Sequence, residues 1–392
     1  RNQERMYSLL WLLDETKTAM GSRKLKSWIE NPLIDINEIE KRYTIVSTLL
    51  EEFILSEDLR KYLYNVYDLE RLCGRISLGS ANARDLIQLK ESLKTLPEIN
   101  NILKKINYQE LPDVSKLYNL LESSLYETPP PTLKEGYLIK EGYNQELDEL
   151  KDIRKNSKDY IFKIEQEEKE RTGIKNLKVG FNKVFGYYIE VSKGNIKEVK
   201  PEYGWIRKQT LTTGERYITP LLKEKEDIIL GAEEKIISLE FNLFNEIREI
   251  AKTYINKIQY ISKIIAEVDM LLSFAVVSEE NGYIRPTIVD DNIINIKDGR
   301  HPVVEKVNKK EYVSNDIIMG KDTNILLITG PNMAGKSTYM RQLAITVIMA
   351  QIGCFVPCSE CKIPIFDQIF TRIGASDDLV SGESTFMVEM KE

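Results

Sequence analysis

The 392-residue sequence predicts a multidomain, mainly α-helical protein with a small inserted antiparallel β module and an α/β segment at its C-terminal end. Apolar residues recur at helical spacing over residues 1–170 and again from Leu221 to about Ala275. Between these stretches, residues 177–220 are rich in β-branched and aromatic residues, with Gly and Asn as turn formers. From about residue 285 short apolar strands alternate with Pro and Asp, so we place a domain boundary there.

The first helices have recognisable ends and apolar faces. Residues 21–33 begin with Ser22 as a candidate N-cap and end at an Asn-Pro pair. Residues 36–53 and 80–96 each place apolar side chains on one helical face. Ordinary helix packing explains these patterns, so they indicate a structural role for this part of the chain.

A long charged helix is expected from about Asn144 to Glu170, after three consecutive prolines at 129–131 that no helix interior accepts. Roughly 26 residues at 1.5 Å each give a rod of about 40 Å. Its apolar seam is too narrow for a helix surrounded by core, so it needs a partner helix. The helical pattern that returns at Leu221 supplies one. We therefore predict one helix out, a small β module at the tip, and one helix back.

Composition and charge limit the function classes. The chain is 42% hydrophobic and 30% charged, which is typical of a soluble globular protein. No apolar run approaches the roughly 20 residues that span a bilayer, and the first residues lack the apolar core of a secretory signal. We expect a cytoplasmic protein, associated with the nucleoid if it binds DNA. A net charge of −6 argues against a nucleic-acid-binding surface all round, so charge must be examined segment by segment.

Residues 330–337, Gly-Pro-Asn-Met-Ala-Gly-Lys-Ser, match the phosphate-loop pattern G-x4-G-K-[ST]. Glycines let backbone N–H groups turn toward nucleotide phosphates at the start of the next helix, where the helix dipole favours anions. The lysine adds a positive charge, and the Ser337 hydroxyl can ligate Mg²⁺. Both flanks that such a loop needs are predicted: a strand at Ile325–Ile328 and an apolar-faced helix at 338–353. The residues assigned to ATP binding on this basis are Gly330, Pro331, Asn332, Met333, Ala334, Gly335, Lys336, Ser337 and Thr338.

The cysteines predict reduced thiols. Cys354, Cys358 and Cys361 have a spacing that suits zinc in part, and Cys73 is remote from them. A structural zinc site needs a fourth ligand, and the only histidine of the chain, His301, lies far upstream. We therefore do not predict a metal centre formed by these side chains.

Several segments resemble the MutS family of DNA mismatch-repair ATPases. The phosphate loop and its helix, TGPNMAGKSTYMRQ at 329–342, are similar to those of the family. So are DGRHPVVE at 298–305 and RIGASDDLVSGESTFMVEM at 372–390. Further similar segments, in family order, lie at 19–33, 68–86, 180–191, 207–220 and 265–275. The resemblance covers nearly the whole chain and is closest to the bacterial mismatch-recognition type.

The resemblance implies an architecture. Residues 1–170 and 229–285 correspond to a helical core with outgoing and returning lever helices, and 171–228 to a β-rich DNA clamp. Residues 286–392 correspond to the N-terminal part of a P-loop ATPase domain of the ABC type, which is expected to be truncated here. The mismatch-reading part of the family would precede Arg1. The family also implies ATP and Mg²⁺ as cofactors, a homodimer, double-stranded DNA with mismatches as ligand, and a MutL-type partner in repair.

The resemblance also implies roles for residues outside the phosphate loop. Tyr312 and Val313 match the pair that contacts adenine, and the alternative for Tyr312 is an ordinary strand aromatic. Ser381, Gly382 and Ser384 match the signature loop that faces the γ-phosphate bound by the partner subunit. Glu383 departs from the basic or neutral residue of some relatives, so we assign it no role.

The predicted clamp is basic. Residues 175–216 contain nine basic and four acidic side chains, a local charge of +5. A solvated β surface is the ordinary explanation, but the place at a lever tip and the family resemblance favour contacts with DNA phosphates. Thr212 and Thr213 depart from some relatives and put phosphate contact at that turn in doubt. The residues assigned to the DNA backbone are Lys183, Lys193, Arg207, Lys208 and Arg216.

ATP hydrolysis is not expected from these 392 residues. A P-loop ATPase needs a second apolar strand that ends in acidic residues. The nearest candidate ends at Asp367, is interrupted by Pro364 and has no glutamate after Asp367. The family resemblance places the acidic pair beyond residue 390. Two alternatives stay open: a non-enzymatic DNA-binding clamp scaffold, and a MutS relative that acts in recombination.

Overall fold

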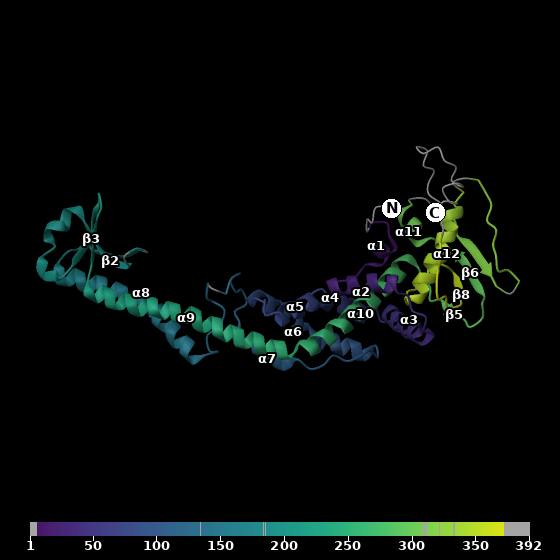
Figure 1. The fold of residues 1–392 in the computed structure, drawn as a ribbon, viewed down its shortest axis with the longest axis horizontal. Helices are drawn as coiled ribbons and strands as arrows, with labels where there is room; N and C mark the ends of the chain where they lie inside the picture. Colours follow the sequence, from purple (N-terminus) through teal and green to yellow (C-terminus); the bar gives the residue numbers. More distant parts are fainter. Residues whose placement is uncertain are drawn as a thin grey trace. The chain divides into compact units, whose positions relative to one another are not determined.

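The computed structural model describes residues 6–133, 135–182, 184, 186–308, 312–320, 322–331 and 334–371, the side chains at 157, 158, 160 and 228–230 excepted. The chain forms two compact units. The first unit comprises residues 1–71, 91–113 and 256–392, and the second comprises 72–90 and 114–255. The elements are mostly helices, with two small sheets, as Figure 1 shows. This confirms the predicted mainly α class with a small inserted antiparallel sheet.

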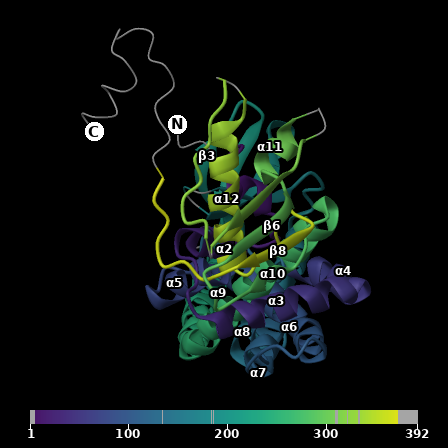
Figure 2. The same ribbon diagram turned by 90° about the vertical axis from the view of Figure 1, so that its right-hand side faces the viewer.

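The first unit contains a helical part and a small sheet. Its helices are α1 (Leu9–Leu13), α2 (Ala19–Glu30), α3 (Ile36–Glu51), α4 (Phe53–Leu63), α10 (Ile255–Asn281), α11 (Pro302–Val307) and α12 (Lys336–Gln351). Its strands, in the order β5-β8-β6-β7, are β5 (Thr287–Ile288), β8 (Glu360–Ile363), β6 (Ile294–Gly299) and β7 (Asn315–Met319). The β5–β8 pair is parallel and the other pairs are antiparallel. Figure 2 shows α12 beside β6 and β8.

A buried carboxylate joins α10 to the start of α2. Asp269 accepts hydrogen bonds from the Lys17 and Thr18 backbone N–H groups and from the Thr18 hydroxyl, at 2.7–3.2 Å. Burial raises the pKa of Asp269, and these donors oppose that shift. Thr18 is also the N-cap of α2, so the prediction of Ser22 as the cap was wrong. The Ser22 hydroxyl lies within the helix and donates to Asp14.

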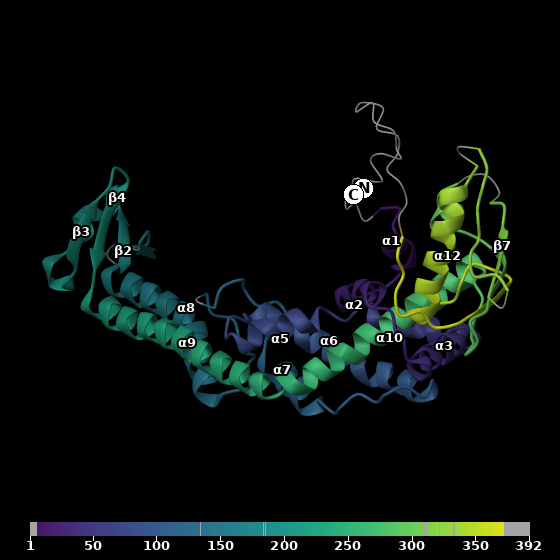
Figure 3. The same ribbon diagram turned by 45° about the vertical axis from the view of Figure 1, so that its right-hand side comes forward.

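The second unit carries two long helices and an antiparallel sheet. Helices α8 (Gln145–Thr172) and α9 (Pro220–Thr253) lie side by side in Figure 3, beside the shorter α7 (Ser115–Ser124). The sheet has the order β1-β2-β4-β3 and consists of β1 (Lys178–Asn182), β2 (Gly186–Ser192), β4 (Gly214–Ile218) and β3 (Ile206–Thr210). Short 3₁₀ turns at Lys193–Glu198 and Pro201–Tyr203 connect β2 to β3. Helices α5 (Leu69–Ser77) and α6 (Ala83–Lys105) contain residues of both units.

The two long helices are joined by a buried ion pair. Lys151 on α8 places its Nζ 3.0 Å from Glu240 Oε1 on α9, and both side chains are almost fully buried. Lys151 also donates to the Ile139 carbonyl, and the Leu138 N–H donates to the other Glu240 oxygen. A buried charge is tolerated when it is paired and hydrogen-bonded, so this pair favours one register of α8 against α9.

Candidate functional site

The predicted strand before the phosphate loop does not form. Residues 325–331 run without assigned secondary structure, and Ile325 and Leu327 are 86% and 89% exposed. The four strands of the first unit pair with one another, and none of those described pairs with 325–328. A parallel strand depends on neighbours that lie far away in sequence, so an apolar run alone does not secure it.

The predicted helix after the loop is confirmed as α12, which begins at Lys336. Its N-cap is Gly335, at φ +91°, a left-handed conformation that glycine adopts without steric cost. Lys336 folds back over the loop, and its Nζ donates to the carbonyls of Gly330 and Pro331 at 2.7 Å each. Asn332 and Met333 lie outside the described residues. Ala334 and Ser337 are exposed, and Thr338 is half-buried.

This donor set fits a phosphate group. Gly335 has no side chain with which to cap the helix, so the first-turn N–H groups of α12 are available to an anion. Among the residues that the structure describes, the Lys336 ammonium is bound by neutral carbonyls, which an anionic ligand would replace at a gain in electrostatic energy. Ser337 is the residue that could ligate a nucleotide-bound Mg²⁺.

Tyr312 lies against the helix that starts at this loop. Its hydroxyl donates to Gln342 Oε1 on α12 at 3.1 Å, and burial raises its pKa. Val313, the second residue of the predicted adenine-contacting pair, is 80% exposed. Tyr339, also on α12, donates to the Asp316 carbonyl in β7 at 3.0 Å. The structure therefore brings the segment before β7 to the first turns of α12. Ser381, Gly382 and Ser384 lie outside the described residues.

His301 is the N-cap of α11. Its Nδ1 accepts from the Val304 N–H at 3.3 Å, and burial lowers its pKa. The thiols of Cys354, Cys358 and Cys361 are unbridged and buried, and burial raises the pKa of Cys354. Within the described ranges no three His, Cys, Asp or Glu side chains form a cluster that could hold a metal ion.

The basic residues predicted to contact DNA differ in their surroundings. Arg207 and Lys208 are exposed on β3, an edge strand of the sheet. The register of β3 against β4 shifts between Arg207 and Gln209, so Lys208 is the extra residue of a β-bulge. Arg207 pairs with Glu215 at 3.2 Å yet leaves 63% of its side chain exposed. Lys193 is exposed, and Lys183 lies outside the described residues.

Arg216 has a different environment from the other predicted cations. On β4, it donates to Glu190 at 2.9 Å and to Gln209 at 3.0 Å, and its guanidinium lies over the Tyr188 ring. Only 19% of its side chain is exposed. These contacts join three neighbouring strands, so Arg216 is engaged within the sheet itself.

Three glutamates that the sequence reasoning missed anchor the sheet to the long helices. On α8, Glu165 accepts from the Val179 N–H at 2.9 Å, and Glu168 accepts from the Trp205 indole at 3.2 Å. On α9, the buried Glu226 accepts from the Tyr187 N–H at 3.1 Å. In the sequence they look like ordinary surface charges of a helix. Each also pairs with a basic residue on its own helix, so the local charge pattern does not reveal its contact with the sheet.

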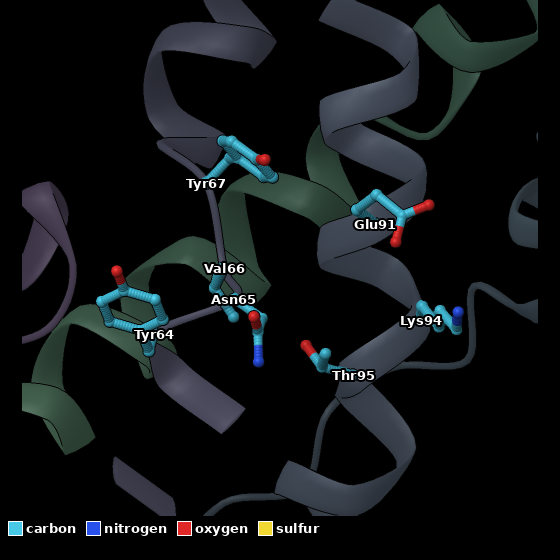
Figure 4. A pocket seen from close by; sticks show the side chains of 7 residues that line it. All are labelled: Tyr64, Asn65, Val66, Tyr67, Glu91, Lys94 and Thr95. Atoms are coloured by element: carbon cyan, nitrogen blue, oxygen red, sulfur yellow. The ribbon is translucent and has the colours of Figure 1, made fainter. Parts of the chain in front are cut away.

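The hollow in Figure 4 belongs to neither candidate site. It measures about 540 Å³ and lies in the first unit between the α4–α5 connection and α6. Its lining residues are Tyr64, Asn65, Val66, Tyr67, Glu91, Lys94 and Thr95. One acid and one base among tyrosines define no particular ligand.

The fold and the two sites define a class: a multidomain, mainly helical protein that carries a small antiparallel sheet between two long helices and a glycine-rich loop before α12. A family model for MutS domain III matches residues 1–275, and a model for MutS domain V matches residues 326–392. The chain therefore belongs to the MutS family. No helix in the described part of the chain is long and apolar enough to cross a membrane.

Bacterial relatives agree with this assignment. Over 400 residues the chain is 56% identical to the DNA mismatch repair protein MutS of Bacillus subtilis (strain 168) and to that of Bacillus pumilus (strain SAFR-032). It is 53% identical to the DNA mismatch repair protein MutS of Listeria monocytogenes serotype 4a (strain HCC23). Each comparison covers 100% of this chain and 46% of the relative. The chain thus spans a little less than half the length of these relatives.

Proposed function

We propose that this chain supplies the DNA-clamp and nucleotide-binding parts of an ATP-dependent DNA mismatch repair protein. The observation that carries the proposal is the loop before α12, where a left-handed glycine leaves the helix start uncapped and a lysine lies across the loop. The names of the relatives and the family membership support the biological context.

The proposed ligand of the loop is ATP with Mg²⁺. Lys336 would exchange the carbonyls of Gly330 and Pro331 for the β- and γ-phosphates, since a charged acceptor forms the stronger hydrogen bond. Ser337 would hold Mg²⁺, which neutralises phosphate charge when bound. The Tyr312 ring would stack on adenine, with Val313 beside it. Ser381, Gly382 and Ser384 would face the nucleotide of a second subunit in a homodimer.

The proposed ligand of the sheet in the second unit is the backbone of double-stranded DNA. The bulge at Lys208 and the exposed Arg207 place two cations along an edge strand. The glutamates of α8 and α9 hold the sheet firmly on its helices, so these cations are presented from a fixed base. Such contacts position a protein on the duplex without reading its sequence. Mismatched DNA as the repair substrate, a MutL-type partner and a cytoplasmic, nucleoid-associated location complete the proposal.

We do not propose ATP turnover by these residues. Asp367, the nearest candidate for the second acidic motif, is exposed and follows β8 by four residues, with Pro364 between them. It therefore lies in a loop and not at the end of a buried strand, where a P-loop ATPase holds its acidic pair.

Calorimetric titration with Mg-ATP tests the nucleotide proposal. We expect binding by the 392-residue chain and a loss of roughly 10- to 100-fold in Lys336→Ala, because hydrogen bonds to charged groups contribute about 1.5–3 kcal/mol. Lys306→Ala, a change of the same charge on α11, is the matched control and should bind as the parent does. Binding that is absent, or unaffected by Lys336→Ala, would leave the DNA-binding scaffold as the better reading.

Fluorescence anisotropy with duplex DNA tests the clamp. The double variant Arg207→Ala/Lys208→Ala should weaken binding to every sequence alike and reduce the salt dependence, because contacts with phosphates carry no sequence information. The matched control is Lys175→Ala/Lys178→Ala, which removes the same charge at and next to β1, the opposite edge strand. Equal weakening by both double variants would show that overall charge, and not the β3 edge, binds the DNA.

A further inference from the structure

One amide on α12 connects the phosphate-loop helix to the proposed nucleobase contact. Gln342 lies six residues after Lys336 and is completely buried. Its Oε1 accepts the hydrogen bond from the Tyr312 hydroxyl at 3.1 Å. Its Nε2 is buried and makes no hydrogen bond with the residues that the structure describes. The polar side chain thus makes one bond at one end and none at the other.

The space for this amide depends on a glycine in β6. A methyl group at Gly299 would come within 2.5 Å of Gln342 Nε2. Gly299 pairs with Asn315 at the start of β7, three residues after Tyr312. The end of β6, the segment before β7 and the second turn of α12 therefore converge on the Gln342 side chain.

The different hydrogen bonding of Oε1 and Nε2 indicates the role of the Gln342 side chain. Burying an unpaired N–H costs free energy, which a methionine of similar length at the same position would avoid. The gain that opposes this cost is the bond to Tyr312, which fixes where the half-buried ring lies. A ring held in one position loses less conformational entropy when a planar ligand stacks on it.

We propose that Gln342 is a positioning residue that holds the Tyr312 ring for stacking on the nucleobase, and that Gly299 makes room for its amide. This inference rests on the proposed nucleotide binding. It assigns the selectivity for a base-bearing ligand over bare phosphate to the Gly299–Gln342–Tyr312 contact. Lys336, one and a half turns earlier on the same helix, serves the phosphates. The phosphates and the base of one nucleotide would thus both be positioned from a single helix, α12.

The test compares Mg-ATP with Mg-pyrophosphate by calorimetry. Tyr312→Phe keeps the ring and removes the hydroxyl, and Gln342→Met keeps the length of the side chain and removes the amide that accepts the bond. We expect each variant to weaken Mg-ATP binding about threefold to tenfold, the range of one neutral hydrogen bond. The double variant should be no weaker than Tyr312→Phe alone, because both changes break the Tyr312–Gln342 bond. Pyrophosphate affinity should stay unchanged in all three.

Thr346→Val is the matched control, since it alters a buried polar side chain one turn further along α12 and should leave both affinities unchanged. Losses that multiply in the double variant, or that extend equally to pyrophosphate, overturn the positioning role. Single variants that bind Mg-ATP as the parent does overturn it too, while the phosphate-loop proposal stands. A parent chain that binds neither ligand overturns the proposed function and this inference with it.

Discussion

The two ends of helix α12 differ. The N-terminal end follows a glycine-rich loop, and the C-terminal end is held by hydrogen bonds from other segments of the chain. At its start, Gly335 offers no side chain as a cap, and Lys336 donates to the nearby carbonyls of Gly330 and Pro331. At its end, the Ala350 carbonyl accepts from the Tyr43 hydroxyl at 2.7 Å, and the Ile352 carbonyl accepts from Arg42 at 2.8 Å. Two of the carbonyls at this end, where a helix leaves its carbonyls unpaired, thus receive donors from α3.

Gln351 makes further hydrogen bonds at the C-terminal end of α12. The Gln351 carbonyl accepts from the Leu33 N–H at 3.0 Å. The Gln351 side chain donates to the Leu33 and Phe366 carbonyls and accepts from the Phe366 N–H, all at 2.8–3.0 Å. Arg42 also places its positive charge at the negative end of the helix dipole, and burial lowers its pKa to about 10.

The difference between the two ends of α12 predicts separate roles for them, one in stability and one in ligand binding. A helix is stiff along its axis, so a firmly held C-terminal end gives the N-terminal end a fixed position. We expect changes at the C-terminal end to alter stability and changes at the loop to alter binding.

Gly353→Ala should have the largest effect. Gly353 has φ +89°, where alanine costs roughly 1–2 kcal/mol, and its new methyl would lie 2.5 Å from Arg42 Cβ. With overpacking added, we expect a loss of about 3 kcal/mol in the free energy of unfolding, measured by urea denaturation. Gly335→Ala is the matched variant, with φ +91° and open space around the methyl in the part of the chain described. It should cost about 1 kcal/mol, for backbone strain alone, and weaken Mg-ATP binding instead. Equal losses of stability in the two variants would contradict the contrast between the ends.

Gln351→Leu should follow, because it leaves the Leu33 carbonyl and both backbone groups of Phe366 without their partner. Unpaired buried polar groups cost about 1–3 kcal/mol each, and water can reach some of them here. We expect a loss of about 2 kcal/mol in urea denaturation, with Mg-ATP affinity unchanged. Gln368→Leu, at an exposed position, is the control and should stay within about 0.5 kcal/mol of the parent. A marked fall in ATP affinity would show that the two ends are not independent.

Tyr43→Phe removes a single hydroxyl and should cost about 1 kcal/mol, since it leaves the buried Ala350 carbonyl without that donor. The ring is completely buried and keeps its edge contact with Phe355, so packing is retained. The control is Tyr64→Phe, whose parent side chain is 77% exposed and should tolerate the change. Thermal denaturation of both variants checks this, and equal midpoints would argue against the capping role of Tyr43.

The two ends of α12 also illustrate which structural features could be predicted from local sequence patterns. Local spacing was enough for α12, for the paired α8 and α9, and for the sheet between them. It failed at 325–328, because a strand needs neighbours that no local pattern reveals. It also placed the cap of α2 at Ser22, whereas the structure has Thr18 there, since either hydroxyl suits that role locally. The capping of α12 by Tyr43 joins residues about 300 positions apart and leaves no local trace.

The predicted sites divide in the same way. The phosphate loop could be predicted because a short pattern of glycines and a lysine encodes a backbone turn and a charge directly. Charge counting found the basic sheet but could not separate the exposed Arg207 from Arg216, which the strand order places among Glu190, Gln209 and Tyr188. The buried position of Gln342 could not be predicted, because a single glutamine in a helix is ordinarily a surface residue.

His301→Asn should have the smallest effect, and only in acid. His301 caps α11, and burial together with the nearby Arg341 charge lowers its pKa. Its folded pKa is therefore below its unfolded value of about 6.5, so the unfolded chain binds more protons in this range and stability falls as pH falls through about 6.5. Asparagine keeps an N-cap acceptor but does not titrate. Between pH 7.5 and 5.5 we expect the parent to lose up to about 1 kcal/mol relative to the variant in urea denaturation. His301 is the only histidine in the chain, so no other imidazole contributes to this difference. If the free energy of unfolding changes with pH in the same way in both proteins, protonation of His301 does not weaken the cap of α11.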